Sequence, residues 1–163
     1  MTSAESEDPR ERPHYTDYDT RLGAYVVIVR DGRLLLALWN ERHRWTLPGG
    51  GVELHESPAE AAVREAREET GYDVQLTGLL GIETDVFSPE QRLRGSGRDS
   101  GRALKAVRVF YAARIVGGEL TDEADGTTDE ARWFPLADVP DLTRVSMVDT
   151  GLRLLDESRR SRE

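Results

Sequence analysis

Three clustered glutamates are the residues of this chain best suited to chemistry, because Glu68 and Glu69 follow Glu65 by three and four residues. In a helix with 3.6 residues per turn, this spacing places the carboxylates together on one face. Like charges so placed repel, and a divalent cation would remove the repulsion. Hard cations such as Mg²⁺ commonly take one or two carboxylates together with substrate phosphates. The spacing therefore indicates a cation site, and a solvated charged helix face is the alternative.

A glycine turn precedes the glutamates and favours the cation site over the alternative. The three glycines at 49–51 allow positive φ angles and a close approach of the backbone to a ligand. Helix signals follow: Ser57 suits the N-cap, the proline after it suits the first turn, and Glu60 completes a capping box. Gly71 suits the left-handed residue that ends a helix. The sequence therefore predicts a helix over Pro58–Thr70.

The rest of this helix would serve to position the glutamates. Arg64 lies four residues before Glu68 and is placed to hold a carboxylate. The stripe expected to lie against a sheet is small and mildly apolar, and it consists of Ala59, Val63, Ala66 and Thr70.

The segment from Gly50 to Tyr72 resembles the Nudix box of the Nudix hydrolases. Gly50 is followed after five residues by Glu56, and after seven more by the run Arg64-Glu65-Ala66-Arg67-Glu68-Glu69-Thr70-Gly71-Tyr72. Every fixed position of the motif is filled. Ala66 and Tyr72 stand at its two loosely apolar positions, where Tyr72 is the less usual residue. A match of this completeness is far more specific than a short glycine motif, and the resemblance extends over about residues 21–155.

The resemblance implies an α/β fold, specifically a Nudix-type α/β/α sandwich whose mixed β-sheet is flanked by the box helix and a C-terminal helix. The residue pattern alone supports an α/β or an α+β fold. It predicts a hairpin whose strands, 23–29 and 33–39, are joined by Asp31–Gly32 and covered on both faces. The other predicted elements are a loop at 40–44, a short strand at 45–47, one or two strands within 73–87, strands at 103–116 and 131–134, and a helix carrying Val145, Val148, Leu152 and Leu155.

The composition is that of a chain able to bury one core. Its 163 residues include no cysteine, 37% are hydrophobic, and the formal net charge is −9. These values predict one domain, give no sign of an oxidising compartment, and argue against general nucleic-acid binding. No apolar run approaches membrane-spanning length and the N-terminus lacks a signal-peptide core, so we expect a cytoplasmic protein. The expected organisation is a mobile arm at 1–20, a single Nudix domain at 21–158 and a tail at 159–163.

The resemblance also implies roles for individual residues. The three clustered glutamates would hold Mg²⁺ or Mn²⁺, with the backbone carbonyl of Gly49 as a further ligand, and Glu65 would alternatively help to deprotonate water. Arg64 would orient the carboxylates. Glu56 is expected to support the junction of loop and helix, with a cation role left open. The family often adds a carboxylate from outside the box; the candidates are Glu119, Asp122, Glu123 and, ranked first, Glu130 beside the last strand.

Four further residues are candidates for substrate contact: Arg21, Trp45, Arg94 and Arg98. Trp45 would stack on a base, or alternatively belong to the core. Arg94 and Arg98 lie in the segment 88–102, which has four arginines and no apolar periodicity in an otherwise acidic chain. Because arginine matches phosphate geometry, this segment could fold over a polyphosphate when substrate binds, but the sequence slightly favours a solvated mobile loop.

The implied activity is hydrolysis of a phosphoanhydride bond in a nucleoside diphosphate linked to another group. The small-molecule substrate would be a nucleotide sugar such as ADP-ribose, or a non-standard or oxidised nucleoside triphosphate. A Nudix-fold nucleotide sensor without catalysis remains open, although the intact box argues against it. A decapping-type hydrolase of nucleic-acid ends also remains open, and the net negative charge argues against that. A homodimer is a further possibility, because many members of the family dimerise.

Overall fold

A computed structural model describes residues 12–93, 101–121 and 128–163 of this chain. The described residues fall into two compact units. One lies within Met1–Arg21 and Thr84–Val107, and the other lies within Leu22–Glu83 and Arg108–Glu163. The glutamate cluster belongs wholly to the second unit.

Strands predominate over helices along the chain. In order, the elements are β1 (Asp19–Val27), β2 (Val29–Arg30), β3 (Arg33–Trp39), η2 (Asn40–Arg42), β4 (Arg44–Thr46), β5 (Gly49–Gly51), α1 (Pro58–Thr70), β6 (Tyr72–Phe87), α2 (Pro89–Leu93), β7 (Leu104–Gly118), β8 (Thr128–Pro135), η3 (Leu136–Asp141) and α3 (Ser146–Arg160).

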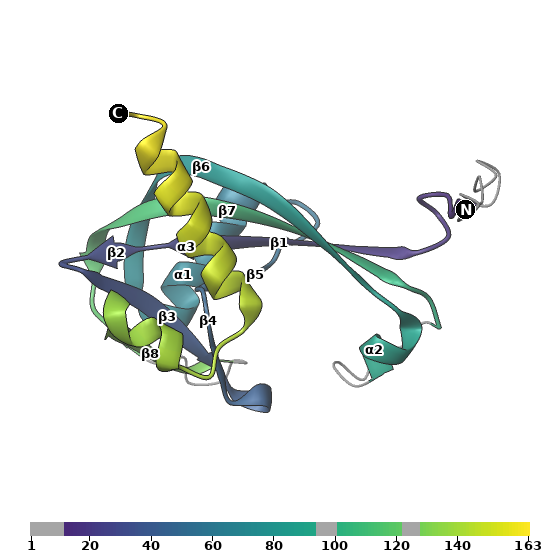
Figure 1. The fold of residues 1–163 in the computed structure, drawn as a ribbon, viewed down its shortest axis with the longest axis horizontal. Coiled ribbons are helices and arrows are strands. Elements are labelled where there is room, and N and C mark those ends of the chain that lie inside the picture. The colour runs from purple at the N-terminus through teal and green to yellow at the C-terminus, as the bar shows by residue number, and fades with distance from the viewer. Residues whose placement is uncertain (1–11, 94–100, 122–127) are drawn as a thin grey trace, which may run out of the picture. The chain divides into compact units, whose positions relative to one another are not determined.

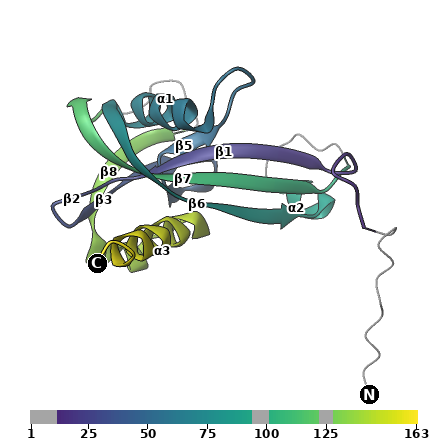
Figure 2. The ribbon, with the colours of Figure 1, turned by 90° about the horizontal axis from the view of Figure 1, so that it is seen from above.

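The strands form two four-stranded sheets. One has the order β5-β1-β7-β6, and in the other β3 pairs with β2, β4 and β8. The pairing of β3 with β8 can be followed in Figure 1. Within the second unit, α1 and α3 lie on opposite faces of the strands (Figure 2). The predicted α/β sandwich, with a mixed sheet flanked by the box helix and a C-terminal helix, is therefore confirmed.

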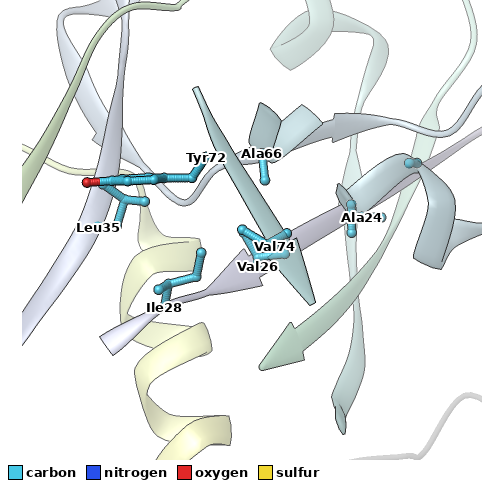
Figure 3. Close-up of a cluster of buried hydrophobic side chains, with 9 residues drawn as sticks. Ala24, Val26, Ile28, Leu35, Ala66, Tyr72 and Val74 are labelled. Carbon is cyan, nitrogen blue, oxygen red and sulfur yellow. The ribbon is translucent and has the colours of Figure 1, made fainter. Parts of the chain in front are cut away.

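The second unit has a hydrophobic cluster on each face of its strands, because alternate residues of β1 and β3 point to opposite faces. The cluster beneath α1 (Figure 3) contains Ala24, Val26, Ile28, Leu35, Ala61, Ala62, Ala66, Tyr72 and Val74. The cluster beneath α3 contains Tyr25, Val27, Leu34, Leu36, Leu47, Phe110, Val139, Val148 and Leu154. The prediction that these strands are covered on both faces is confirmed.

The hairpin between β2 and β3 has the turn that the sequence predicts. Asp31 and Gly32 have φ angles of 52° and 70°, the left-handed conformation that a tight two-residue turn requires. The register places Arg30 directly opposite Arg33. The turn therefore fixes which side chains meet across the hairpin.

Several elements differ from the predicted bounds. The segment at 73–87 is one strand, β6, which is one of the two predicted alternatives, whereas the predicted strand at 23–29 is divided into β1 and β2, and β8 is longer than predicted. Helix α2 lies where the sequence pattern indicated a loop. Its first turn has Ser88 Oγ accepting from the Gln91 amide at 3.2 Å and Gln91 Oε1 accepting from the Ser88 amide at 2.8 Å. This capping pair was visible in the sequence, because the spacing of Ser88 and Gln91 repeats that of Ser57 and Glu60.

Asp19 organises the contacts of the first unit. Its carboxylate pairs with Arg92 at 2.8 Å and with Arg102 at 3.4 Å, and its amide donates to the Ala103 carbonyl at 2.9 Å. Arg92 also donates to the Arg102 carbonyl at 2.6 Å. Two arginines of the basic segment 88–102 are thus used in holding that segment to the start of β1, while Arg94 and Arg98 lie outside the described residues.

Across residues 12–93, 101–121 and 128–163, no helix has both the length and the apolar character needed to cross a membrane.

Candidate active site

Helix α1 begins and ends as the sequence predicts. Ser57 Oγ accepts from the Glu60 amide at 3.1 Å, and Glu60 Oε2 accepts from the Ser57 amide at 2.7 Å. Gly71 ends the helix with a φ of 80°, and its amide donates to the Arg67 carbonyl at 2.9 Å. A Cβ on Gly71 would lie 2.2 Å from the Glu119 carbonyl oxygen, so only glycine fits there. These caps fix where each glutamate falls along the helix.

The face of α1 that lies against the strands differs from the prediction. Ala66 and Thr70 of the predicted stripe are buried, but the prediction is wrong for Val63, which is 37% exposed. The buried residues of the helix are Ala61, Ala62, Ala66, Glu69 and Thr70. The small alanines face the sheet because they let the helix backbone approach the strands closely, and Val63, although more apolar, would hold it away.

Among the three glutamates, Glu69 differs most from its predicted place on the outer face of the helix, because it lies at the sheet and is only 5% exposed. A buried carboxylate needs compensation, and the Gly49 amide supplies it by donating to Glu69 Oε2 at 3.0 Å. Gly49 has a φ of 149°, and a Cβ there would lie 2.2 Å from the Ala24 carbonyl oxygen. Glycine is therefore required at this position so that strand β5 can pair with β1 while its amide faces the helix.

Gly50 makes room for a second carboxylate. A Cβ at Gly50 would lie 2.5 Å from Glu65 Oε1. The Glu65 side chain is accordingly mostly shielded, with 17% of it exposed. The glycine segment, predicted as a turn that approaches a ligand, is a short strand that closely approaches the carboxylates of the protein itself.

Arg64 connects the remaining carboxylates. It donates to both oxygens of Glu56, from Nε at 2.9 Å and from Nη2 at 2.6 Å. Its Nη1 donates to Glu65 at 3.0 Å and to Glu68 at 3.1 Å, the contact expected from their spacing. Nη2 also donates to the Gly51 carbonyl at 3.2 Å. One guanidinium thus joins helix α1, strand β5 and the loop between them.

This network changes the pKa of both of its principal partners. The hydrogen bonds from Arg64, followed by one from the Glu53 amide, lower the pKa of Glu56 from 4.5 to about 2. The same hydrogen bond raises the pKa of Arg64 above its ordinary value. Glu56 is therefore ionised and bound to Arg64 at any physiological pH, as its expected place at the loop–helix junction requires.

The carboxylates are ligands of the type that hard cations prefer, although Glu65 and Glu68 are oriented toward Arg64. Across residues 12–93, 101–121 and 128–163, no three acidic or histidine side chains stand close enough to share one ion. The donors are nevertheless oxygen atoms from successive turns of one helix, which is the ligand type of Mg²⁺ and Mn²⁺. Glu68 has 47% of its side chain exposed, so packing does not confine its carboxylate to Arg64. The donor type of these residues thus fits a divalent cation.

The candidates outside the box lie in different surroundings. Glu130 is half-buried in β8, opposite Leu38, and its carboxylate pairs with Arg132. Glu119 is exposed beside Gly71, at the end of α1. Asp122 and Glu123 lie outside the described residues.

Two of the candidates for substrate contact, Trp45 and Arg21, lie among the described residues. Trp45 packs edge-on against Phe134, with ring centroids 4.6 Å apart, and joins the cluster beneath α3. These contacts support the core alternative for Trp45. Arg21 is exposed in the first unit.

A NUDIX domain is matched by residues 19–151 of this chain. The "Putative 8-oxo-dGTP diphosphatase" of Bacillus subtilis (strain 168) is 38% identical over 84 residues, which are 50% of this chain and 56% of that protein. The "ADP-ribose pyrophosphatase" of Methanocaldococcus jannaschii is 32% identical over 119 residues, 71% of this chain and 62% of that protein. The "RNA pyrophosphohydrolase" of Marinomonas sp. (strain MWYL1) is 31% identical over 123 residues, 70% of this chain and 76% of that protein. This chain thus spans less than two thirds of the length of the first two relatives.

Solved structures share the fold. A NUDIX hydrolase from Nitrosomonas europaea superposes with a TM-score of 0.70 at 20% identity, covering 86% of this chain and 90% of that chain. A MutT NUDIX hydrolase from Burkholderia pseudomallei superposes with a TM-score of 0.64 at 27% identity, covering 83% of this chain and 98% of that chain. Since the matched domain covers most of the chain and contains the intact box, this chain belongs to the Nudix family.

Proposed function

We propose that this chain is a Mg²⁺- or Mn²⁺-dependent hydrolase that cleaves a phosphoanhydride bond in a nucleoside diphosphate linked to another group. The observation that carries the proposal is that Glu65 and Glu68 bind Arg64 while Glu69 binds the Gly49 amide of β5, within a chain of the Nudix family. The names of the three relatives specify different substrates, and each substrate contains a phosphoanhydride. The relatives therefore support cleavage of a phosphoanhydride bond more strongly than they support any one nucleotide as the substrate.

Each glutamate of α1 would have its own role at the cation. Glu68 and Glu69 would be ligands, with Glu65 either a third ligand or the group that removes a proton from the attacking water, and the carbonyl of Gly49 would add a backbone oxygen. When bound, the cation would neutralise charge on the phosphoryl oxygens and favour ionisation of a bound water. The hydrogen bond from the Gly49 amide would help to orient Glu69, and the one from Arg64 would help to orient Glu65.

The substrate that the relatives favour is a nucleotide sugar such as ADP-ribose or an oxidised nucleoside triphosphate. Glu130 is the carboxylate from outside the box that we propose as a further ligand or base, and its ion pair with Arg132 must open for that role. Arg94 and Arg98 remain the proposed contacts to the polyphosphate.

Hydrolysis of nucleic-acid ends is the second candidate function, because one relative is named an RNA pyrophosphohydrolase. The net charge of −9 works against it, since a phosphate backbone would be repelled. A catalytically inactive nucleotide sensor is a third, and the complete set of box carboxylates argues against that.

A nucleotide panel tests the proposal. We expect Mg²⁺- or Mn²⁺-dependent release of monophosphate or phosphate from at least one of ADP-ribose, nucleotide sugars, dinucleoside polyphosphates, oxidised dNTPs and triphosphorylated RNA, with EDTA abolishing it. Glu68→Gln should lower kcat by about 100-fold or more while leaving the circular dichroism spectrum unchanged. Glu41→Gln, the same change at an exposed position of η2, is the matched control and should keep wild-type turnover.

Two outcomes would contradict the proposal. Wild-type kcat in Glu68→Gln would remove this carboxylate from the cation site. Tight binding of a panel nucleotide without turnover under any cation would favour the sensor.

Glu65→Gln should also be strongly impaired in turnover. Loss of the acidic limb of the pH–rate profile in this variant would assign Glu65 as the base rather than a ligand.

A further inference from the structure

A surface hollow lies at the β2–β3 hairpin of the second unit. It has a volume of about 440 Å³ and is lined by Arg30, Asp31, Arg33 and Trp133. That volume is within the usual range of small-molecule sites. None of the lining residues belongs to the candidate active site, so the hollow calls for an explanation of its own.

Two like charges face each other across this hairpin. Arg30 and Arg33 are directly opposite in the antiparallel register of β2 and β3, and like charges in that position destabilise a strand pair. Neither forms an ion pair with any residue within 12–93, 101–121 or 128–163. Asp31, in the turn, brings one carboxylate to the lining, so the hollow carries a net positive charge. A bound anion would remove the repulsion.

An aromatic platform holds Arg30 in place. The central carbon of its guanidinium lies 4.5 Å from the centroid of the Trp133 ring and 5.8 Å from that of Tyr72. Trp133 Nε1 donates to the Tyr72 hydroxyl at 3.2 Å, and the two rings meet edge to face. In Figure 3 the Tyr72 ring lies beside Leu35, with its hydroxyl pointing away from Val74.

Stacking in this way prepares Arg30 to bind an anion. A guanidinium placed over a ring keeps all of its N–H donors in its own plane, where they can reach a ligand. Its rotamer is already restricted, so binding costs less conformational entropy than with a free arginine. Tyr72 is the less usual residue at its box position, and this arrangement gives it a function separate from cation binding, namely to support Arg30 and Trp133.

We propose that this hollow binds a small phosphate-bearing anion, held by Arg30 and Arg33 with Trp133 as its apolar wall. Two arginines offer the planar donor pairs that phosphate oxygens accept. The source is either a nucleoside monophosphate, whose base would contact Trp133, or inorganic pyrophosphate. The proposal does not depend on the proposed hydrolysis, since it involves none of the same side chains.

The test uses the full chain in EDTA, so that no divalent cation supports binding at the glutamates. AMP and pyrophosphate are titrated separately while the indole N–H resonance of Trp133 is followed by NMR, with Trp133→Phe identifying that resonance. We expect a saturable shift. Arg33→Gln should weaken the apparent Kd by about tenfold or more, the effect of losing a charge-assisted hydrogen bond. Arg159→Gln, the same change at an exposed position of α3, is the matched control and should bind like the wild type.

The outcomes separate the sources and the alternatives. Saturation by AMP alone assigns the site to a nucleotide, and saturation by both anions with equal dependence on Arg33 assigns it to the phosphate group itself. A Trp133 resonance that moves with neither anion, or equal affinity in the wild type and Arg33→Gln, overturns the proposal. Arg33→Gln should be at least as stable as the wild type without anion, because it removes the like-charge pair, so misfolding does not obscure the result. Nucleotide turnover should persist in Arg33→Gln.

Discussion

Arg64 is the residue on which the contacts of the candidate site converge. Its planar guanidinium holds Glu56 at both oxygens while also reaching Glu65 and Glu68. A lysine at this position would offer one compact ammonium in place of the rigid fork, and would not hold three carboxylates at once. The site therefore depends on the shape of this side chain as well as on its charge.

The pKa of Glu56 gives a prediction for stability against pH. The pKa is lowered from 4.5 to about 2 in the folded protein, so between these values the unfolded state binds the additional proton. The stabilisation from Glu56 should be fully present above pH 4.5 and should be lost as the pH falls toward 2. Urea denaturation at several pH values in this window should show a steep loss of unfolding free energy in the wild type.

The comparison with Glu56→Gln makes this prediction specific. The variant lacks the titrating group, so its loss of stability across the same window should be shallower. Glu41→Gln, which changes an exposed glutamate of η2, should follow the wild-type curve. If Glu56→Gln and the wild type lose stability in parallel, the Arg64–Glu56 contact does not govern acid unfolding.

Strand β5 and helix α1 function as one element at the next scale. The strand has three adjacent glycines whose surroundings differ completely. A Cβ at Gly49 would meet backbone, the Ala24 oxygen at 2.2 Å; one at Gly50 would meet the Glu65 carboxylate at 2.5 Å; and one at Gly51 would meet nothing within 4 Å. The same substitution at the three positions therefore separates folding from catalysis.

Alanine at each glycine should give a different result. Gly49→Ala should destabilise the protein by about 3 kcal/mol, because a positive φ and a backbone clash combine. Gly50→Ala should keep most of its stability, since a side-chain end can move, but its kcat should fall as Glu65 is displaced. Gly51→Ala is the control and should resemble the wild type in both respects.

Thermal unfolding and kinetics with the best nucleotide of the panel would measure the three variants. Wild-type kcat in Gly50→Ala would show that the position of Glu65 against β5 is not needed for turnover. An unaltered Tm in Gly49→Ala would contradict the backbone clash.

At the scale of the whole molecule, binding of the cation should raise the stability of this acidic chain. A ligand that binds only the folded state stabilises it by about 2.7 kcal/mol at a concentration of 100 times Kd. For a chain of this length, that corresponds to a rise in Tm of about 5–10 °C. Saturating Mg²⁺ or Mn²⁺ should therefore raise the Tm, and EDTA should reverse the change.

Variants of the box assign this shift to the proposed site. Glu68→Gln should lose most of the Tm increase, whereas Glu41→Gln should retain it. An equal increase in Glu68→Gln would mean that the cation stabilises the protein elsewhere on its acidic surface. Since this measurement needs no substrate, it tests the cation site even if the correct nucleotide is absent from the panel.

The sequence by itself determined the features that depend on neighbouring residues. The bounds of α1 follow from Ser57, Glu60 and Gly71, and the hairpin follows from Asp31–Gly32. Caps and tight turns are decided within about four residues, so their chemistry can be read directly. The box carboxylates were identified for the same reason, since their spacing along a helix is local. Helix α2 was missed although its capping pair was present, because an arginine-rich segment lacks the apolar stripe that usually indicates a helix.

Only the tertiary structure decided which surfaces meet. Two of these contacts join segments far apart in the chain: Gly49 binds Glu69, and Arg30 lies over Trp133. The exposure of Val63 likewise depends on the strands against which α1 packs. Such contacts depend on strand register and on how closely a helix approaches a sheet. Both are set by the packing of all the side chains together, since a helix face is buried only relative to the strands beneath it.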